Sequence, residues 1–342
     1  MTTGDLSTLL VWGAATAFTI ALVAYSADLA RIADRAQKRV PVAAGARAAG
    51  SRPATAVAGS EEQSAPGRSP RAEGIARSTT LLGLVLLFAG IVTRGIAAGR
   101  WPTANMYEFT IVGVLVAVAV LTVVQRRRVI AFVGVLVMGI AVLALVLALN
   151  AFFVQADQVQ PALQSYWLVL HVGVAITATG IFTVAFAASV LQVLRSLREE
   201  QGAPVDAPAV TVGADAPRRS DGVRRAVGGP RFGWLEQVPG SRELEALSFR
   251  LNSVAFVLWT LTLIGGAIWA EDAWGRYWGW DPKEVGTFVA WVVYAAYLHA
   301  RTTRGWSGRR AAYFVFVGYG VVLANFTVVN LVVTGKHSYS GV

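Results

Sequence analysis

The sequence contains no cysteine and only three histidines, and charged residues occupy just 15% of its 342 positions. Without cysteine the chain forms no disulfide, no thiol redox pair and no covalent CxxCH attachment site of its own. It also has no P-loop, no GxGxxG turn, no HExxH zinc helix and no recognisable nucleophile triad. These absences argue against disulfide-rich secreted proteins, nucleotide-binding enzymes and zinc hydrolases.

Hydrophobic residues, in contrast, make up 55% of the chain and gather in repeated apolar stretches. The apolar core of a bilayer is about 30 Å thick and takes about 20 apolar residues per helix. The pattern therefore predicts an all-α polytopic integral membrane protein with about eight transmembrane helices. The first stretch lacks the basic start and cleavage site of a signal peptide, so it counts as a span. The predicted spans cover residues 6–27, 79–97, 109–124, 129–149, 166–194, 251–270, 285–300 and 312–334.

Two tracts rich in Pro, Gly, Ala and Arg interrupt the apolar stretches and divide the chain into five parts. Residues 1–30 hold the first span, and residues 78–194 hold the second to fifth. Residues 31–77 and 195–240 are predicted to be disordered cytoplasmic loops, because their composition is unsuited to a packed core. Residues 241–342 carry the last three spans and most of the tryptophans.

The basic residues predict the orientation of the bundle. A net charge of +10 would indicate nucleic acid in a soluble protein, but all except five of the 30 Lys and Arg fall in loops on one side of the predicted spans. Basic loops stay cytoplasmic, and short loops count most in this rule. The sequence therefore predicts a multi-pass plasma (cytoplasmic) membrane protein with both termini outside and no nucleic-acid partner.

The connection between the sixth and seventh spans is unusually aromatic. Five aromatic residues precede the charged run Asp281-Pro282-Lys283-Glu284, and Gly275 and Gly279 leave the backbone bare. Such a surface suits a planar ligand, although interfacial Trp and Tyr also form anchoring belts on most membrane proteins. The five are Trp269, Trp274, Tyr277, Trp278 and Trp280.

The three histidines lie at different depths. His171 is about 7–8 Å below the start of the fifth span and His337 directly follows the eighth, so both are predicted outside. His299 lies some 21 Å into the seventh span, near its cytoplasmic end. A lone histidine near a span end is more often an interfacial polar residue than a ligand. An ionisable residue inside a span is functional by default.

Two carboxylates in the aromatic loop have two interpretations. Asp281 and Glu284 are either general acid–base groups or caps of the seventh span, where negative charge suits the helix N-terminus. Pro282 in the first turn favours capping. In the same way Ser241 is the predicted N-cap of a short amphipathic start to the sixth span.

Taken together, these features indicate haem. A planar, hydrophobic, dianionic ligand with an open metal is suited by an aromatic surface, by imidazoles on both sides and by nearby cations. Paired histidines are recognised axial ligands of haem iron. Arg276, Lys283 and Lys336 are candidate partners for the propionates on the outer face.

The same residues resemble a known family. Residues 274–284, WGRYWGWDPKE, look like the tryptophan-rich WWD signature of haem-handling proteins in cytochrome c maturation. The whole set is similar to the CcsA/ResC type, named CcsB in some lineages, of the System II pathway. The resemblance covers about residues 78–124, 150–175 and 241–342. Its other motifs are Asn105-Met106-Tyr107-Glu108, Tyr166-Trp167-Leu168 with His171-Val172, Leu247-Ser248-Phe249-Arg250, Tyr297-Leu298-His299-Ala300-Arg301 and Gly335-Lys336-His337-Ser338-Tyr339.

The resemblance implies two haem sites. His171 and His337 would be axial ligands of haem b at the external aromatic loop. His299 would belong to a second site nearer the cytoplasm, with its opposite ligand supplied by a ResB/Ccs1-like membrane partner. The predicted haem-binding residues are His171, His299, His337, Trp269, Trp274, Tyr277, Trp278, Trp280, Asp281, Arg276 and Lys283.

The resemblance also implies a function. Haem would move outward and be presented to the CxxCH of a secreted apocytochrome c, whose thiols form thioethers with its vinyl groups. The chain would then be a component of a cytochrome c haem lyase (holocytochrome c synthase) complex. It would supply orientation and iron ligation rather than a nucleophile. Thiol-reducing proteins and membrane lipid are further candidate partners.

Three alternatives stay open at this point. One is a haem exporter without synthase activity, which the sequence does not separate from a synthase. Another is a membrane electron carrier of the b type, although that class normally has paired histidines at matching depths inside the bundle. The third is a purely structural assembly subunit, for which haem binding would survive substitution of the histidines.

Overall fold

The computed structural model describes residues 2–38, 70–126, 131–158, 165–202 and 220–337. Regular structure in these ranges is entirely helical, which confirms the predicted all-α class. The elements are α1 (Thr3–Lys38), α2 (Pro70–Ala98), α3 (Met106–Val124), α4 (Ala131–Asn150), α5 (Tyr166–Gly202), α6 (Ser220–Gly228), the 3-10 helix η2 (Pro230–Gln237), α7 (Ser241–Trp274), α8 (Pro282–Arg304), α9 (Arg309–Phe326) and α10 (Val328–Leu331).

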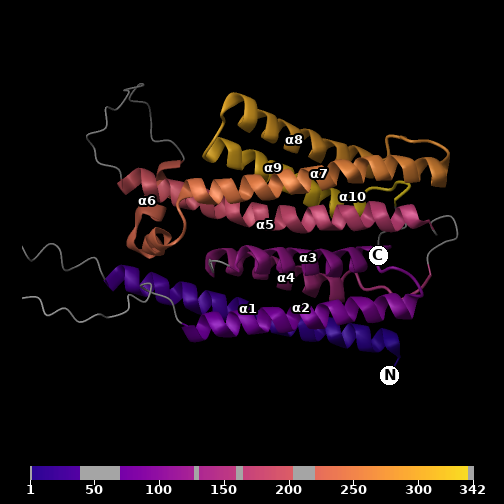
Figure 1. Cartoon of the computed structure of the whole chain (residues 1–342), viewed down its shortest axis with the longest axis horizontal. Helices are drawn as coiled ribbons and strands as arrows, with labels where there is room; N and C mark the ends of the chain where they lie inside the picture. The colour runs from indigo at the N-terminus through magenta and orange to yellow at the C-terminus, as the bar shows by residue number, and fades with distance from the viewer. Residues whose placement is uncertain (1, 39–69, 127–130, 159–164, 203–219, 338–342) are drawn as a thin grey trace, which may run out of the picture.

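The long helices lie side by side in one elongated bundle (Figure 1). α1 packs along α2, α5 along α7, and α8 along α9, while α3 and α4 join the first pair to α5. The start of α1, the α2–α3 turn and the α7–α8 connection lie at one end, which we call the aromatic end. α6 and η2 lie at the opposite end, which we call the basic end (Figure 1).

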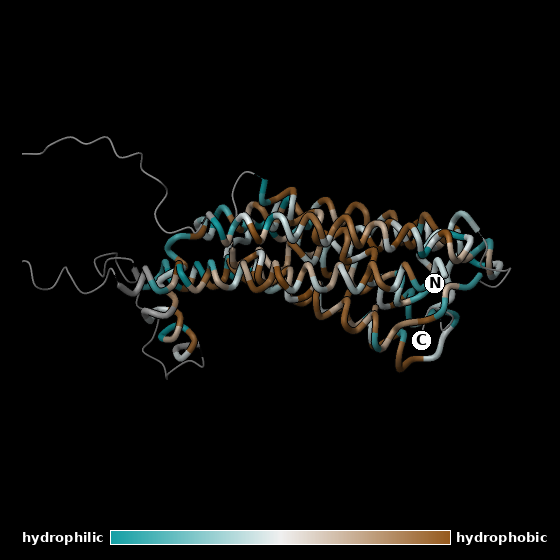
Figure 2. The backbone as a smooth tube through the Cα atoms, turned by 90° about the horizontal axis from the view of Figure 1, so that it is seen from below, coloured by the Kyte–Doolittle hydropathy of each residue, from teal (hydrophilic) through white to brown (hydrophobic). Residues whose placement is uncertain are grey.

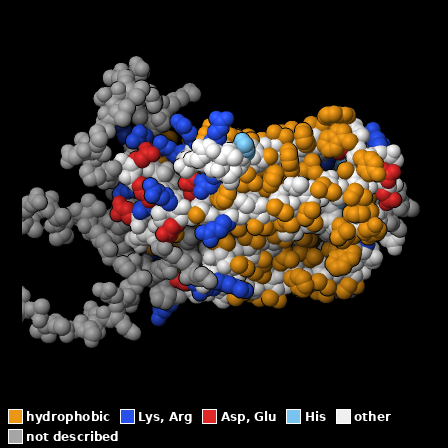
Figure 3. All heavy atoms as spheres, turned by 45° about the horizontal axis from the view of Figure 1, so that its top comes forward, with side chains coloured by type: hydrophobic (Ala, Val, Ile, Leu, Met, Phe, Trp, Pro, Cys, Tyr) orange, Lys and Arg blue, Asp and Glu red, His pale blue; other side chains and the backbone are white. Residues whose placement is uncertain are grey.

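The surface of the bundle is that of a membrane protein. Hydrophobic residues dominate the middle of the backbone trace, and hydrophilic residues gather towards its ends (Figure 2). The face shown in Figure 3 has a broad hydrophobic area between charged ends. Seven helical segments in the described ranges are long and apolar enough to cross a bilayer. They are α1, α2, α3, α4, α5, α7 and α9 continued by α10.

α8 is the exception among the eight predicted spans. It has 23 residues and therefore a length of about 35 Å, enough to cross a bilayer. Polar and aromatic residues lower its hydropathy below that of the other seven, because Lys283 and Glu284 begin it and His299, Arg301 and Arg304 lie in its last two turns. It nevertheless packs along α9, parallel to the rest of the bundle (Figure 1).

The described parts of the two predicted disordered loops are helical. α1 continues to Lys38 and α2 begins at Pro70, so only residues 39–69 of the first tract lie outside the described residues. In the second tract, α6 and η2 fold against the ends of α5 and α1. Trp234 and Leu235 are buried there, and Trp234 stacks on Phe132 of α4 at 5.1 Å. The prediction of disorder was wrong for these residues because the short apolar run in η2 completes the core.

Local capping fixes the helix ends that border the aromatic end. α7 stops at Gly275, whose φ of 68° favours glycine. α8 starts at Asp281 with a full capping box completed by Glu284, which confirms the capping interpretation of these two carboxylates. The predicted N-cap Ser241 is instead the first residue of α7, and its hydroxyl donates to Glu199 of α5.

Candidate functional site

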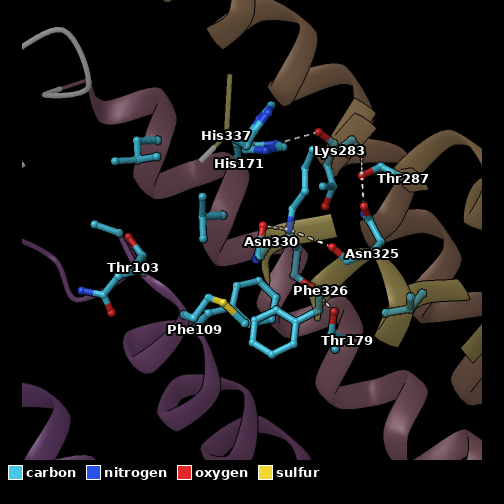
Figure 4. A pocket seen from close by; sticks show the side chains of 18 of the residues that line it. Thr103, Phe109, His171, Thr179, Lys283, Thr287, Asn325, Phe326, Asn330 and His337 are labelled. Atoms are coloured by element: carbon cyan, nitrogen blue, oxygen red, sulfur yellow. Dashed lines mark hydrogen bonds between the residues drawn. The ribbon is translucent and has the colours of Figure 1, made fainter. Parts of the chain in front are cut away.

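Two histidines from distant parts of the chain meet at the aromatic end. His171 lies one turn into α5, and His337 follows α10, yet both line one cavity of about 760 Å³, counting its open mouth (Figure 4). Both rings pack near Trp269, with ring centroids 5.9 Å and 6.2 Å from it. The structure therefore brings together the two outer histidines that the sequence singled out.

In both imidazoles the same ring nitrogen, Nδ1, makes a hydrogen bond within the chain. His171 Nδ1 is 2.9 Å from the carbonyl oxygen of Thr262, and His337 Nδ1 is 2.7 Å from Asp281 Oδ2. A carbonyl or carboxylate oxygen only accepts, so each Nδ1 is protonated and donates. In the neutral form of each ring, Nε2 then carries the lone pair. Histidines that bind metals in proteins almost always donate their other ring N–H in this way.

Asp281 has a second role besides capping α8. Its Oδ2 accepts from the Lys283 amide at 3.2 Å and from His337, and its Oδ1 accepts from the Lys336 amide at 2.6 Å. Burial raises the pKa of Asp281, but the bonds from His337 and Lys336 outweigh it and lower that pKa to about 2. A Cβ on Gly335 would lie 2.6 Å from Oδ1, so a glycine is needed for this close approach. The carboxylate thus stays ionised and fixes the segment that carries His337.

A glycine also makes room for the other imidazole. A Cβ on Gly266 of α7 would lie 2.7 Å from Cε1 of His171, closer than real Cβ contacts allow. The bare backbone of α7 lets the His171 ring approach that helix closely, within reach of the Thr262 carbonyl. The position of the ring therefore depends on a residue without a side chain.

Lys283 supplies the positive charge of the cavity. Its ammonium group donates to the carbonyl oxygen of Asn325 at 2.9 Å and to Asn330 Oδ1 at 2.7 Å. Both acceptors are neutral, so these hydrogen bonds orient the cation without neutralising it. Asn325 and Lys283 lie on the wall opposite Thr103 (Figure 4). The arrangement suits a ligand that carries negative charge on one edge.

Stacked phenylalanines form another part of the cavity wall. Phe109 of α3 and Phe326 of α9 stack with ring centroids 4.8 Å apart, and both rings line the cavity (Figure 4). A wall with polar groups and a wall with aromatic rings together suit a flat apolar ligand with a charged edge.

The predicted aromatic surface divides into inner and outer members. Trp269 is buried, and Trp274 lies against His337 with ring centroids 5.2 Å apart. Tyr277 and Trp278 line a neighbouring cavity of about 420 Å³ together with both histidines. Trp280 has a positive φ of 57° and is 74% exposed, and it borders neither of these cavities. Arg276 also borders neither cavity, and its guanidinium group lies over Gly279.

His299 is not part of this cluster. It lies on α8 about 27 Å along the helix axis from Asp281, and its side chain is exposed. Its carbonyl oxygen accepts from the Thr303 hydroxyl, as in an ordinary helix. Nearby, Arg301 pairs with Glu245 of α7 and lies over the Phe249 ring. The structure therefore separates the inner histidine from the outer pair, as the sequence predicted.

Several site residues were not predicted from the sequence. The Thr262 carbonyl is a backbone group and has no sequence signature, and Gly266 matters only because of what packs against it. Asn325 and Asn330 had a usable signal, since amide side chains in a predicted apolar span are expensive and tend to be functional.

Comparison with known proteins identifies the family. Residues 103–337, well over half of the chain, match the family described as cytochrome C assembly protein. The chain belongs to the cytochrome c assembly protein family. Both outer histidines and the whole aromatic loop lie inside the matched region. Membership confirms the resemblance drawn from the WWD-like motif and makes this a membrane protein of cytochrome c biogenesis.

Curated relatives and a solved structure agree with this assignment. The chain is 35% identical over 281 residues to cytochrome c biogenesis protein CcsA of Synechococcus sp. (strain CC9902), covering 78% of this chain and 86% of the relative. It is 35% identical over 269 residues to the CcsA of Prochlorococcus marinus (strain MIT 9313), covering 75% and 80%. The cytochrome c haem lyase CcmF shares the fold, with a TM-score of 0.57 at 15% identity. That match covers 95% of this chain but about half of the larger protein, 47%.

Proposed function

We propose that the cavity at the aromatic end binds haem b as a substrate, with His171 and His337 as the two axial ligands of its iron. The observation that carries this proposal is the matched pair of hydrogen bonds from Nδ1 to Thr262 and Asp281. In a neutral ring, each bond leaves Nε2 with the lone pair that an iron needs. Trp269 and Trp274 pack beside the ligands, and Lys283 holds the propionate edge.

The proposed reaction is covalent attachment of this haem to an apocytochrome c. Each thiol of a CxxCH motif adds across one vinyl group: the S–H bond and the vinyl π bond are lost, an S–C bond forms, and the proton goes to the other vinyl carbon. No electrons are consumed. The chain contributes ligation and orientation, which replace a bimolecular encounter by a positioned one. It acts in this proposal as one component of a haem lyase complex, with thiol-reducing proteins keeping the cysteines available.

The second proposed component is a ResB-like membrane partner at the exposed histidine of α8. An imidazole on an apolar helix surface is unfavourable in lipid unless another molecule covers it. His299 is exposed, and so are Val289 and Val292 on the same helix. A partner that supplied a second imidazole here would complete an inner haem site, from which haem moves outward. In this arrangement the protein lies in the plasma membrane with the aromatic end outside.

Co-expression with a ResB-like partner and a secreted CxxCH reporter tests the proposal. Haem on the purified complex and covalent haem on the reporter are measured for the single variants His171→Ala, His337→Ala and His299→Ala. We expect each outer variant to lose attachment and to regain part of it with added imidazole, which replaces the missing ligand. Normal reporter maturation in all three variants would contradict the assignment. Haem binding without any attachment in the wild-type complex would favour a haem exporter instead.

A further inference from the structure

A second cleft opens directly beside the histidine cavity. The α2–α3 turn and the start of α5 form it, and it holds about 1310 Å³, counting its open mouth. Thr103, Ala104 and Leu168 line both this cleft and the histidine cavity, so the two spaces adjoin at these residues. The other lining residues include Gly99, Arg100, Trp101, Gln158, Tyr166 and Leu170.

A buried ion cluster holds the wall of this cleft in place. Glu108 is fully buried and accepts from Arg94 at 3.1 Å, from Arg100 at 2.7 Å and from the Ala104 amide at 2.9 Å. Both guanidinium groups also donate to backbone carbonyls within residues 154–157. The cluster thus ties the α2–α3 turn to the segment after α4. Removal of one partner from a buried ion pair is strongly destabilising, so the cluster fixes where the α2–α3 turn lies beside the cleft.

The rim and the shared wall both present groups that suit a polypeptide. Trp101 is 71% exposed and Tyr166 is 68% exposed. Large aromatic side chains of this kind dominate the binding energy of protein interfaces. In the shared wall the Thr103 hydroxyl is buried and has no hydrogen-bond partner among the described residues. Buried polar groups are normally paired, so this hydroxyl is available to a water or to a polar group of a bound molecule.

The orientation of the haem follows from the opposite wall. Lys283 and Asn325 face Thr103 across the cavity (Figure 4). The two propionates of haem b share one edge of the macrocycle, and the two vinyl groups lie on the other side. Propionates held at Lys283 therefore direct the vinyl groups towards Thr103, Ala104 and Leu168. The vinyl edge faces the wall that the outer cleft shares.

We propose that this cleft binds the CxxCH segment of the apocytochrome, so that both thiols approach the vinyl groups past Thr103 and Ala104. The inference rests on the proposed haem site, and it names where the second substrate of that site docks. The competing occupant is the lipid headgroup layer, because exposed Trp and Tyr also anchor membrane proteins. Continuity with the ligand cavity and the unpaired hydroxyl favour the peptide.

The first test removes the aromatic rim. In the full complex, the double variant Trp101→Ala/Tyr166→Ala is compared with the control variant Trp12→Ala. The control removes an exposed tryptophan of α1 that lines neither of the two spaces. We expect the double variant to keep its haem and to lower covalent haem on the reporter about tenfold, as for the loss of interface hot spots. The control changes neither. Unchanged attachment, or loss of bound haem from the double variant, would overturn the inference.

The second test identifies the occupant directly. A photoreactive phenylalanine analogue at position 101 is expected to cross-link to the reporter, and the same analogue at position 12 is not. Cross-links from position 101 to lipid alone would show a membrane anchor and overturn the proposal. A wild-type complex without haem at His171 and His337 would remove the proposed function itself, and that outcome is read from the absorption spectrum before any cross-linking.

Discussion

The outer histidine pair and the inner histidine have contrasting surroundings. His171 and His337 each donate a ring hydrogen bond to an acceptor within the chain, and both lie near Trp269. His299 is exposed on α8, and the contacts described for it involve its backbone carbonyl. A ligand pair preorganised inside one chain would need no other protein to bind a metal, whereas in the proposed arrangement the single exposed imidazole depends on a partner. The comparison predicts that histidine substitutions at the two sites have different effects on haem binding.

The largest expected effect separates the two sites. In protein purified without a partner, His171→Ala and His337→Ala each bind haem much more weakly, because one imidazole of a two-ligand site is removed and only saturating haem fills the site. His299→Ala keeps it, because the outer pair is intact. Titration with haem followed by absorption spectroscopy measures both outcomes. An equal loss in all three variants would show that the sites are not independent.

The next effect concerns the carboxylate behind His337. Asp281→Asn keeps a good N-cap but replaces one of the two acceptor oxygens by a donor, so we expect a modest fall in the melting temperature. The imidazole loses its charged acceptor, and loss of such an outer partner typically lowers metal affinity by about 10- to 100-fold. Haem titration and thermal unfolding are measured on the same preparation. A fall in stability with no change in affinity would restrict Asp281 to capping.

The charge of Lys283 should be visible in ligand selectivity. Lys283→Met preserves length and removes the cation, and hydrogen bonds to charged groups contribute about 1.5–3 kcal/mol. We expect haem to bind roughly tenfold more weakly to the variant, while haem dimethyl ester binds both proteins alike. Competition between the two ligands gives the ratio directly. Equal discrimination by both proteins would place the propionates elsewhere.

The smallest effect comes from a single methyl group. Gly266→Ala pushes a Cβ against the His171 ring, and overpacking of this kind costs about 1–3 kcal/mol. We expect haem affinity to fall about fivefold. Gly173→Ala is the matched control on α5, since its Cβ would meet nothing within 4 Å. If both alanines had the same effect, the packing of His171 on α7 would not matter for binding.

The sequence predicted the parts of the structure that have strong local patterns. Apolar stretches of membrane-spanning length indicated the helical bundle, and the capping box at Asp281 indicated the start of α8. The outer histidines were identified because histidine is rare here and both lie at span ends. A WWD-like run then linked them to the loop. These inferences depend on residue type and spacing, which the sequence displays.

What remained hidden depends on contacts between distant segments. The Thr262 carbonyl and Gly266 become part of the site only when α5 packs on α7. Asp281 already had a sufficient explanation as a cap, so nothing in the sequence required its bond to His337. The order of η2 was missed because a Pro- and Gly-rich composition outweighed the apolar pair Trp234 and Leu235, which is buried in the bundle.

The spin state of ferric haem bound to the purified protein tests the central claim most directly. Two imidazole ligands from His171 and His337 should give a six-coordinate, low-spin spectrum by electron paramagnetic resonance. Either single alanine variant, reloaded with haem, should give a high-spin spectrum that added imidazole returns to low spin. A low-spin spectrum that survives both substitutions but disappears in His299→Ala would contradict the account.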